Sequence, residues 1–230
     1  MSDTIEIIPT VVPHSRDSFV AATQIAAQFT PRIHFDVDDG IFTHEVSWPF
    51  TKMGQIGPFD FAAIAPVAVD VHLMVEEPQK IIAHFIDAGA KRIIVHFETY
   101  PDKSAIFGSI TECRSRGVEI GLALLIDTPI EVLAPFASKL DFVHLMTIAA
   151  IGRQGIRYDS RGADRVRAVH HNFPELMIQV DGGVNDTNIA ELVRAGARRF
   201  GVGAAIMLQD DPRGSYQVIQ SVAESALGSQ

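Results

Sequence analysis

Imidazole and carboxylate side chains that could hold a metal ion occur at three separate places in the chain. His34 and Asp36 lie two residues apart in an apolar run that turns acidic. Alternate side chains of an extended chain share a face, so these two point the same way. His72 lies in a second apolar run, and Asp181 follows a third. Each alone has an ordinary explanation, as a hydrogen-bonded core histidine or a helix-capping acid.

Together, two imidazoles and two carboxylates form a donor set suited to one divalent transition-metal ion. Zn²⁺ is the first choice for such a set, and Fe²⁺, Mn²⁺ and Co²⁺ are the alternatives, whereas the imidazoles disfavour calcium. The prediction requires a fold that brings distant segments to one place.

The composition limits the kind of protein. With 47% hydrophobic residues among 230, the chain can bury a large core, and we expect one domain over residues 1–230. A net charge of −9 argues against nucleic acid and anionic membranes as partners. The single cysteine, Cys113, excludes an internal disulfide and suits a reducing compartment. No signal-like or membrane-spanning run is present, so we expect a cytoplasmic protein.

Short β-branched runs alternate with amphipathic stretches along the chain, which is typical of repeated βα units. Because closure removes both exposed sheet edges, we expect an α/β fold with a closed (β/α)₈ barrel, and its chemistry at the carboxyl ends of the strands. The predicted strands are 5–12, a run that begins at residue 32, 67–74, 91–97, 118–126, 142–148, 177–180 and 199–202.

Helices are expected in the intervals between strands. Apolar spacing predicts one from about residue 16 to 29, and Gly89 is expected to end another. A short helix should follow the long loop 41–58. Proline in a first turn predicts a further helix start at 127–129. The last helix should begin near Ser215.

Several motifs, in this order and spacing, resemble the ribulose-phosphate 3-epimerase family over nearly the whole chain. They are 34–40 (HFDVDDG), 70–75 (DVHLMV), 88–90 (AGA), 94–98 (IVHFE), 121–124 (GLAL), 128–129 (TP), 146–147 (MT), 180–184 (VDGGV) and 195–197 (AGA).

The resemblance implies a single ribulose-phosphate-binding TIM barrel that uses one divalent metal to invert C3 of a ketopentose 5-phosphate. It implies that His34, Asp36, His72 and Asp181 are the metal ligands, and that Asp36 and Asp181 are also the acid and base. Inversion across a planar enediolate needs one carboxylate on each face, and a metal ion can stabilise that anion as a Lewis acid.

Further residues are expected to bind substrate by the same resemblance. Backbone N–H groups in the two glycine-containing turns could hold a phosphate without side chains. Arg153 and Arg157 could add contacts to a phosphate, or be solvated loop residues. The expected substrate-binding residues are Thr10, His72, Met74, Met146, Gly182, Gly183, Gly203 and Ala204.

Departures from the family leave the substrate open. Asp38 stands where the family usually has methionine, and it would add a negative charge near the reacting carbons if it pointed inward. Ala204 replaces a usual serine, and the loop 149–157 and the pair 125–126 also differ. The substrate could therefore be ribulose 5-phosphate and xylulose 5-phosphate or another sugar phosphate, such as a hexulose phosphate. The alternative is an inactive barrel that binds metal and ligand as a binding or regulatory protein.

Other candidates receive structural interpretations. His144 shares a strand face with Met146, and we expect it to be a hydrogen-bonded interior histidine, as we do for His96 with Glu98. Aromatic residues in the loop 41–58 could form a lid or a subunit contact, and we expect a homo-oligomer.

Overall fold

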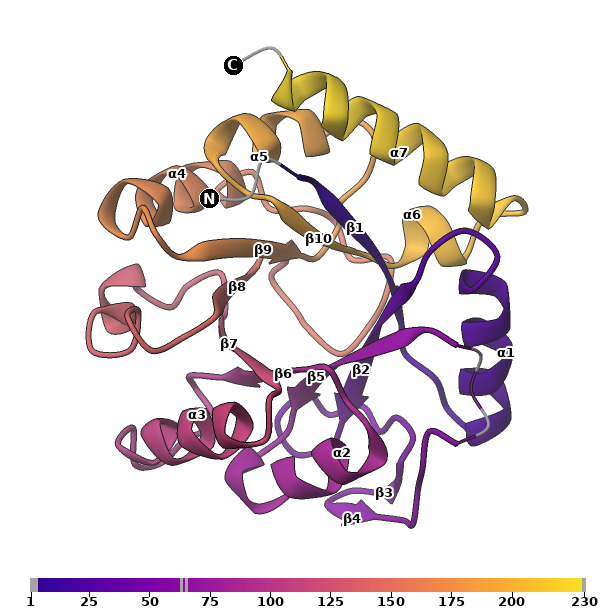
Figure 1. Cartoon of the computed structure of the whole chain (residues 1–230), viewed down its shortest axis with the longest axis vertical. Helices are drawn as coiled ribbons and strands as arrows, with labels where there is room; N and C mark the ends of the chain where they lie inside the picture. Colours follow the sequence, from indigo (N-terminus) through magenta and orange to yellow (C-terminus); the bar gives the residue numbers. More distant parts are fainter. Residues whose placement is uncertain (1–3, 63, 65, 229–230) are drawn as a thin grey trace.

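Eight parallel strands close into a barrel in the computed structural model, which describes residues 4–62, 64 and 66–228. The order around the barrel is β1-β10-β9-β8-β7-β6-β5-β2, and β1 closes it by pairing with β2 (Figure 1). The predicted barrel is thus confirmed. Its strands are β1 (Glu6–Val11), β2 (Arg32–Asp38), β5 (Ala68–Met74), β6 (Arg92–His96), β7 (Glu119–Leu124), β8 (Phe142–Met146), β9 (Met177–Asp181) and β10 (Arg199–Val202).

Helices surround the barrel on the outside (Figure 1). Ser15 caps the first helix by accepting a hydrogen bond from the backbone N–H of Ser18, and Gly89 ends the second with φ of 108°, as predicted. The helices are α1 (Arg16–Ala26), α2 (Ile82–Ala88), α3 (Ala105–Ser115), α4 (Gly162–Asn172), α5 (Ile189–Ala195), α6 (Ala204–Met207) and α7 (Pro212–Leu227). Two 3₁₀ turns, η1 (Pro78–Lys80) and η2 (Ile130–Leu133), complete the ring.

Three helix predictions are wrong in part. The first helix ends at Ala26 rather than at 29. The helix predicted after residue 129 is only the turn η2, because Pro135 has no N–H to continue it. The described residues between 59 and 66 form no helix, and the loop before them instead holds the hairpin β3 (Phe50–Lys52) and β4 (Gln55–Ile56).

Aromatic packing explains the chain path after that hairpin. The rings of Phe59 and Phe61 lie 6.0 Å apart, Phe59 packs on Phe85 at 4.6 Å, and Phe61 packs on Phe19 at 5.7 Å. The two side chains thus contact different helices, α1 and α2. Tertiary contacts therefore determine the conformation of this segment, whatever its local propensity.

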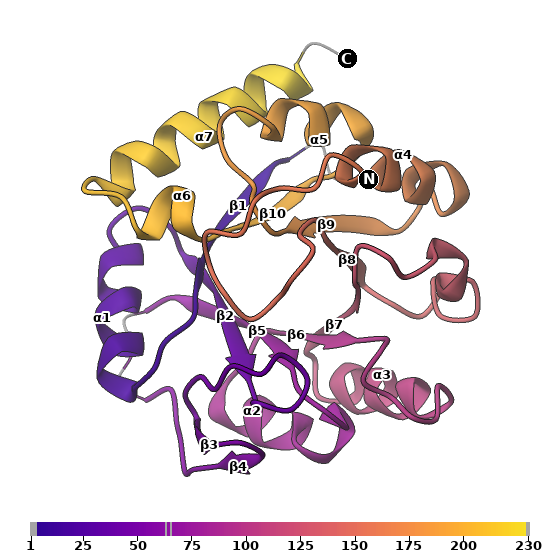
Figure 2. The same cartoon turned by 180° about the vertical axis from the view of Figure 1, so that it is seen from behind.

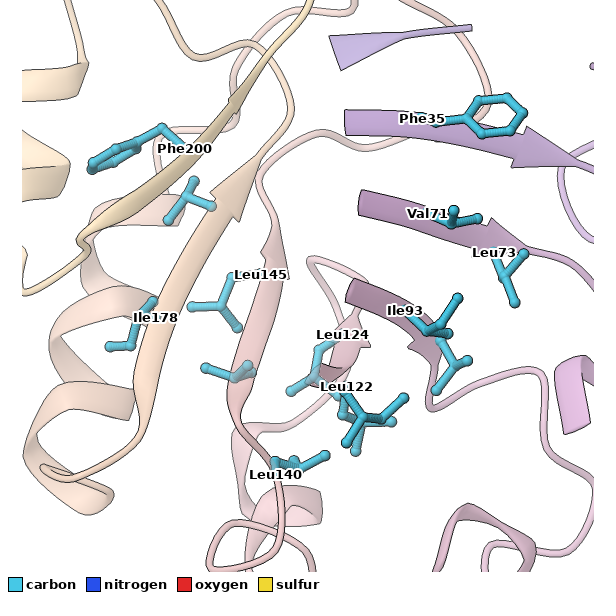
Figure 3. Packing of buried hydrophobic residues seen from close by; sticks show 14 of the residues in the cluster. Phe35, Val71, Leu73, Ile93, Leu122, Leu124, Leu140, Leu145, Ile178 and Phe200 are labelled. Carbon is cyan, nitrogen blue, oxygen red and sulfur yellow. The ribbon is translucent and has the colours of Figure 1, made fainter. Parts of the chain in front are cut away.

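The main core lies between the strands and the helices. Figure 3 labels members of this core, among them Phe35, Val71, Leu145 and Phe200, which are fully buried. Because side chains alternate along a strand, the residues between them face the barrel interior. There the strands carry a small apolar group, Ile94, Ala123 and Phe142, and a larger set of polar side chains. None of the described helices is long and apolar enough to span a membrane.

Strand register sets which polar side chains meet. Asp36 pairs with His72 across β2 and β5, and Met146 pairs with Asp181 across β8 and β9. Partners in neighbouring strands lie about 5 Å apart. The polar residues near the strand ends therefore collect at one mouth of the barrel.

Candidate functional site

The structure brings all four predicted metal ligands together. His34 Nε2 lies 3.1 Å from Asp36 Oδ1 and 3.3 Å from Asp181 Oδ2. His72 Nδ1 lies 3.0 Å from the same Asp36 oxygen. The two histidines are fully buried, and the two aspartates are buried with small exposed edges. Residues from β2, β5 and β9 thus converge on one point inside the barrel.

His144, on β8, adds a third imidazole to this point. Its ring stacks on that of His34 at 5.4 Å with an interplanar angle of 10°, and its Nε2 lies 3.8 Å from Asp181 Oδ2. His144 is fully buried, yet neither ring nitrogen has a hydrogen-bond partner among the described residues. The predicted interior position is correct, whereas the predicted hydrogen bond is wrong. Its alternation with Met146 was the signal in the sequence.

The donor atoms of this cluster fit a divalent transition metal. One ligand atom each from His34, His72, His144 and Asp181 lies within 4.8 Å of all the others. His34 Nε2 and Asp181 Oδ2 lack a hydrogen bond of good geometry among the described residues, as do both His144 nitrogens. Buried polar atoms are rarely left unpaired, and imidazole with carboxylate suits such ions. These observations favour a metal site without identifying the ion.

A second group of polar residues lies behind His72. His72 Nε2 is 2.9 Å from His96 Nε2, and His96 Nδ1 is 3.1 Å from Glu98 Oε2. The other Glu98 oxygen accepts hydrogen bonds from the backbone N–H of Leu125 and the hydroxyl of Thr128. His96 and Glu98 therefore form an extension of the site, and their shared motif, 94–98, is the only signal for them in the sequence.

The two predicted catalytic carboxyl groups have different protonation behaviour. Burial opposes ionisation of Asp36, but the ring nitrogens of His34 and His72 beside its carboxylate outweigh this effect and lower its pKa to about 2. Burial raises the pKa of Asp181 to about 7, and the charge of Asp36 adds to this effect against the attraction of His34. The pKa values of the two carboxyl groups are therefore shifted in opposite directions. Such a divergence is typical of acid–base pairs.

A cavity of about 530 Å³ opens above the cluster at the carboxyl ends of the strands. His34 and His72 lie beneath it and are fully buried. Most of the predicted substrate-binding and phosphate residues line this one cavity, namely Thr10, Met74, Met146, Arg153, Arg157, Gly182, Gly183, Gly203 and Ala204, together with Asp36 and Asp181.

The loop between β8 and α4 crosses the barrel mouth (Figure 2). Gln154 reaches β1, where its amide nitrogen donates to the backbone carbonyl of Thr10 at 2.7 Å. Arg153 forms an ion pair with Glu45 from the loop after β2, and both Arg153 and Arg157 are exposed. The sequence did not single out Gln154, nor the polar lining residues Tyr158, Ser160, Asn185 and Asn188.

Glycines are required where the chain turns around Asp181. Gly183 has φ of 69°, and a Cβ there would lie 2.6 Å from the backbone nitrogen of Tyr158. On the neighbouring strand, a Cβ on Gly201 would lie 2.8 Å from the carboxyl carbon of Asp181. Glycine at both positions lets the acidic side chain and the loop after it occupy their places.

Asp38, the departure that most affected the functional prediction, is the last residue of β2 and is fully buried. Burial raises its pKa to about 8, and the charge of Asp36 adds to the effect. Near pH 7 the side chain is therefore mainly a neutral acid. It does not bring the full negative charge expected from its residue type.

The chain is similar in sequence to known proteins over most of its length. The model of the "Ribulose-phosphate 3 epimerase family" matches residues 9–207. The chain is 33% identical to ribulose-phosphate 3-epimerase of Bacillus subtilis over 196 residues, which cover 82% of this chain and 85% of that protein. It is 29% identical to the enzyme of that name from Aquifex aeolicus over 199 residues, covering 85% and 86%.

Solved structures share the fold at lower identity. A 3-hexulose-6-phosphate synthase from Salmonella typhimurium superimposes with a TM-score of 0.71 at 14% identity, covering 96% of this chain and 100% of that one. An orotidine 5'-phosphate decarboxylase from Pyrococcus horikoshii gives 0.61 at 16% identity, covering 94% and 98%. At these identities the likeness concerns the barrel alone.

Proposed function

This chain belongs to the ribulose-phosphate 3-epimerase family, and from that premise we propose that it is a metal-dependent isomerase that inverts C3 of a ketose phosphate. The observation that carries the proposal is the convergence of two carboxyl groups, Asp36 and Asp181, on one nitrogen of His34 at the floor of the cavity. Inversion needs two groups that exchange a proton with opposite faces of the same carbon.

The two aspartates have separate tasks in each direction. Asp36, whose pKa is low, accepts the C3 proton from one face, and Asp181, whose pKa is raised, donates a proton to the other. Their strands, β2 and β9, are separated in the barrel by β1 and β10, which leaves room for a planar enediolate between them. In the reverse reaction the two roles are exchanged.

We propose that His34, Asp36, His72 and Asp181 hold one divalent ion, with Zn²⁺ as first choice and Fe²⁺, Mn²⁺ or Co²⁺ as alternatives. The ion would supply Lewis acidity toward the oxygens on C2 and C3. Burial lowers the pKa of His72 to about 4, which favours a neutral nitrogen donor there. For His34, the contact with Asp36 and its charge outweigh burial and raise the pKa, so that a metal ion would displace a proton from this ring.

The rest of the cavity would bind the sugar phosphate. Backbone N–H groups of Gly182, Gly183, Gly203 and Ala204 would hold the phosphate, with Thr10, Met74 and Met146 around the sugar. Arg157 is exposed at the mouth and could reach an anion, whereas Arg153 would first have to leave Glu45. Ribulose 5-phosphate and xylulose 5-phosphate are the first substrates to test, followed by hexulose phosphates.

Proton exchange in D₂O tests this function directly. Metal-loaded protein is incubated with each ketose phosphate, and the C3–H signal is followed by NMR. Exchange should fall about 10²–10⁴-fold in Asp36→Asn and in Asp181→Asn. The exposed Asp210→Asn serves as a matched control and should exchange at the wild-type rate. Absence of C3 exchange with every sugar would favour the alternative, a barrel that binds metal and ligand without turnover.

The protonation behaviour of Asp38 gives less support to the alternative of an inactive barrel. The hypothesis of an inactive protein rested on a negative charge at this position, and the raised pKa leaves a mainly neutral side chain near pH 7. We further propose a homo-oligomer located in the cytoplasm, for which light scattering of the purified protein and fractionation of cells are the tests.

A further inference from the structure

We propose that His96 and Glu98 are positioning residues that hold His72 in the tautomer whose Nδ1 lone pair faces the metal site. The inference rests on the proposed metal-dependent function, since it assigns His72 as a ligand. It concerns two residues that lie outside the predicted ligand set.

Glu98 fixes the direction of the first hydrogen bond. Although burial opposes it, hydrogen bonds from His96 and Thr128 lower the pKa of Glu98 to about 2, so the carboxylate only accepts. One oxygen accepts from the Leu125 N–H at 2.9 Å and from the Thr128 hydroxyl. The other lies 3.1 Å from His96 Nδ1. The ring hydrogen of a neutral His96 is therefore on Nδ1, and its Nε2 presents a lone pair.

The contact between His96 and His72 determines which ring nitrogen of His72 carries the hydrogen. The two Nε2 atoms lie 2.9 Å apart, a distance that requires one hydrogen between them. Since His96 has placed its hydrogen on Nδ1, His72 must donate from Nε2. A neutral imidazole has one N–H, so the Nδ1 of His72 is left with a lone pair.

That lone pair points to a place where a cation is needed. His72 Nδ1 is 3.0 Å from Asp36 Oδ1, and an ionised carboxylate is also only an acceptor. The chain Asp36–His72–His96–Glu98 thus has three contacts and only two ring hydrogens. A divalent ion that accepts electron pairs from both His72 Nδ1 and Asp36 satisfies the contact without a hydrogen.

The opposite tautomer would remove the ligand. If His72 carried its hydrogen on Nδ1, it would donate to Asp36 and leave no lone pair for the ion. The two carboxylates at the ends of the imidazole pair therefore compete for the hydrogens. Glu98 is held in place by Leu125 and Thr128 from the segment after β7, and His96 is fully buried, with the ring of Phe42 at 5.1 Å. This anchoring favours the direction set by Glu98.

Replacing the carboxylate of Glu98 by an amide tests the proposal. In Glu98→Gln the amide oxygen can keep Leu125 and Thr128, while the amide nitrogen faces His96 and donates to it. Both ring hydrogens should then reverse, so that His72 carries its hydrogen on Nδ1. In metal-free protein, ¹⁵N NMR of the histidine rings should show His72 with Nε2–H in the wild type and Nδ1–H in the variant.

Affinity for Zn²⁺ alone is the second measurement, by competition with a chromophoric chelator. Glu98→Gln should bind Zn²⁺ about 10–100-fold more weakly. Two controls separate positioning from packing. The exposed Glu175→Gln makes the same chemical change elsewhere, and Thr128→Val removes one of the two anchors of Glu98 but keeps the carboxylate and its hydrogen bond from the Leu125 N–H. Both should keep the wild-type tautomer and bind Zn²⁺ within about twofold of the wild type, as surface and anchor changes that leave the acceptor in place.

Two results would overturn the proposal: a wild-type His72 with its hydrogen on Nδ1, or unchanged tautomer and Zn²⁺ affinity in Glu98→Gln. Neither the tautomer nor the Zn²⁺ affinity depends on whether the protein turns over a sugar. A protein with the expected tautomers and Zn²⁺ affinities but no C3 exchange would support this inference and refute the proposed epimerase activity.

Discussion

Charged side chains collect at both mouths of the barrel, but only at the amino ends of the strands are acids paired with arginines. At the amino ends of the strands, three arginines alternate with three acids. Arg92 lies 3.0 Å from Asp70, 3.0 Å from Glu6 and 3.1 Å from Glu119. Arg32 contacts Asp70 and, at 3.0 Å, Glu6, and Arg199 lies 2.9 Å from Glu119. The charges of this group sum to zero.

At the carboxyl ends, acids face imidazoles and one another. Asp36 and Asp181 share the nitrogen of His34, and Asp38 is buried near them. His144 has two nitrogens without a hydrogen-bond partner in the described part of the chain. This mouth therefore has buried polar atoms that a cation or a ligand could satisfy, whereas the charged groups described at the other mouth are paired with one another.

The difference shows that polar content inside a barrel does not by itself indicate function. Guanidinium groups bind carboxylates through several N–H donors and remain charged, so the group at the amino ends of the strands stabilises the fold. Imidazoles are weaker partners that can offer lone pairs, so the group at the carboxyl ends of the strands can bind and release ligands. Four substitutions test whether the two mouths differ in this way.

The largest loss of stability is expected at the mouth formed by the amino ends of the strands, from Arg92→Met. The change leaves the fully buried Asp70 with one guanidinium instead of two, and breaking a buried ion-pair network costs about 3–5 kcal/mol of unfolding free energy. Urea denaturation with a chelator present measures it. Zn²⁺ affinity of the folded variant should equal that of the wild type, and a loss of affinity with no loss of stability would reverse the assignment of the two mouths.

Asp38→Asn tests the mouth at the carboxyl ends of the strands through the pH dependence of stability. The folded pKa of about 8 exceeds the ordinary value of 3.8, so the folded state binds more protons than the unfolded state between these values. Wild-type stability is therefore lost as pH rises across this interval, at up to about 1.4 kcal/mol per unit from this group.

The variant should equal the wild type near pH 4 and be more stable at pH 8. Urea denaturation of both proteins at a series of pH values gives the difference. Parallel stability curves for the two proteins would mean that Asp38 is charged at neutral pH and has a partner.

His144→Leu should stabilise the metal-free protein by about 1–3 kcal/mol. Leucine is similar in size and removes two buried nitrogens that have no partners among the described residues. Chemical denaturation in chelator measures the change, and the exposed His84→Leu, expected within about 0.5 kcal/mol of the wild type, is the control. A destabilised metal-free His144→Leu would show that the imidazole is already satisfied without a metal.

The smallest effect is expected from Glu45→Gln, which removes the partner of the exposed Arg153 in the loop over the cavity. Solvent-exposed ion pairs contribute about 0–1 kcal/mol, so the melting temperature should hardly change. The KM for a phosphorylated sugar should change more than the melting temperature if Arg153 becomes free to bind the anion. Equal KM values for Glu45→Gln and the wild type would remove Arg153 from the list of phosphate contacts.

The sequence by itself determined the eight strands, because alternation of short apolar runs and amphipathic stretches reflects burial that any (β/α)₈ chain must satisfy. Seven of the eight predicted strands begin or end within about two residues of those observed, as expected of strongly patterned segments, and the eighth was given only by its start. It also determined His34, Asp36, His72 and Asp181 as a group, since strand ends meet at one mouth. Local pattern failed where distant contacts decide, as for the aromatic segment near Phe59.

Only the tertiary structure decided which side chains touch and in what state. The contact of His72 with His96, the His144 nitrogens without a hydrogen bond among the described residues and the raised pKa of Asp38 depend on register, barrel closure and burial. Two residues far apart in sequence, such as Asp36 and His72, acquire their pKa values from each other, and no local pattern encodes a distance of 3 Å. The physical reason is that electrostatic and hydrogen-bond energies depend on separation and solvent exposure, which exist only once the barrel has closed.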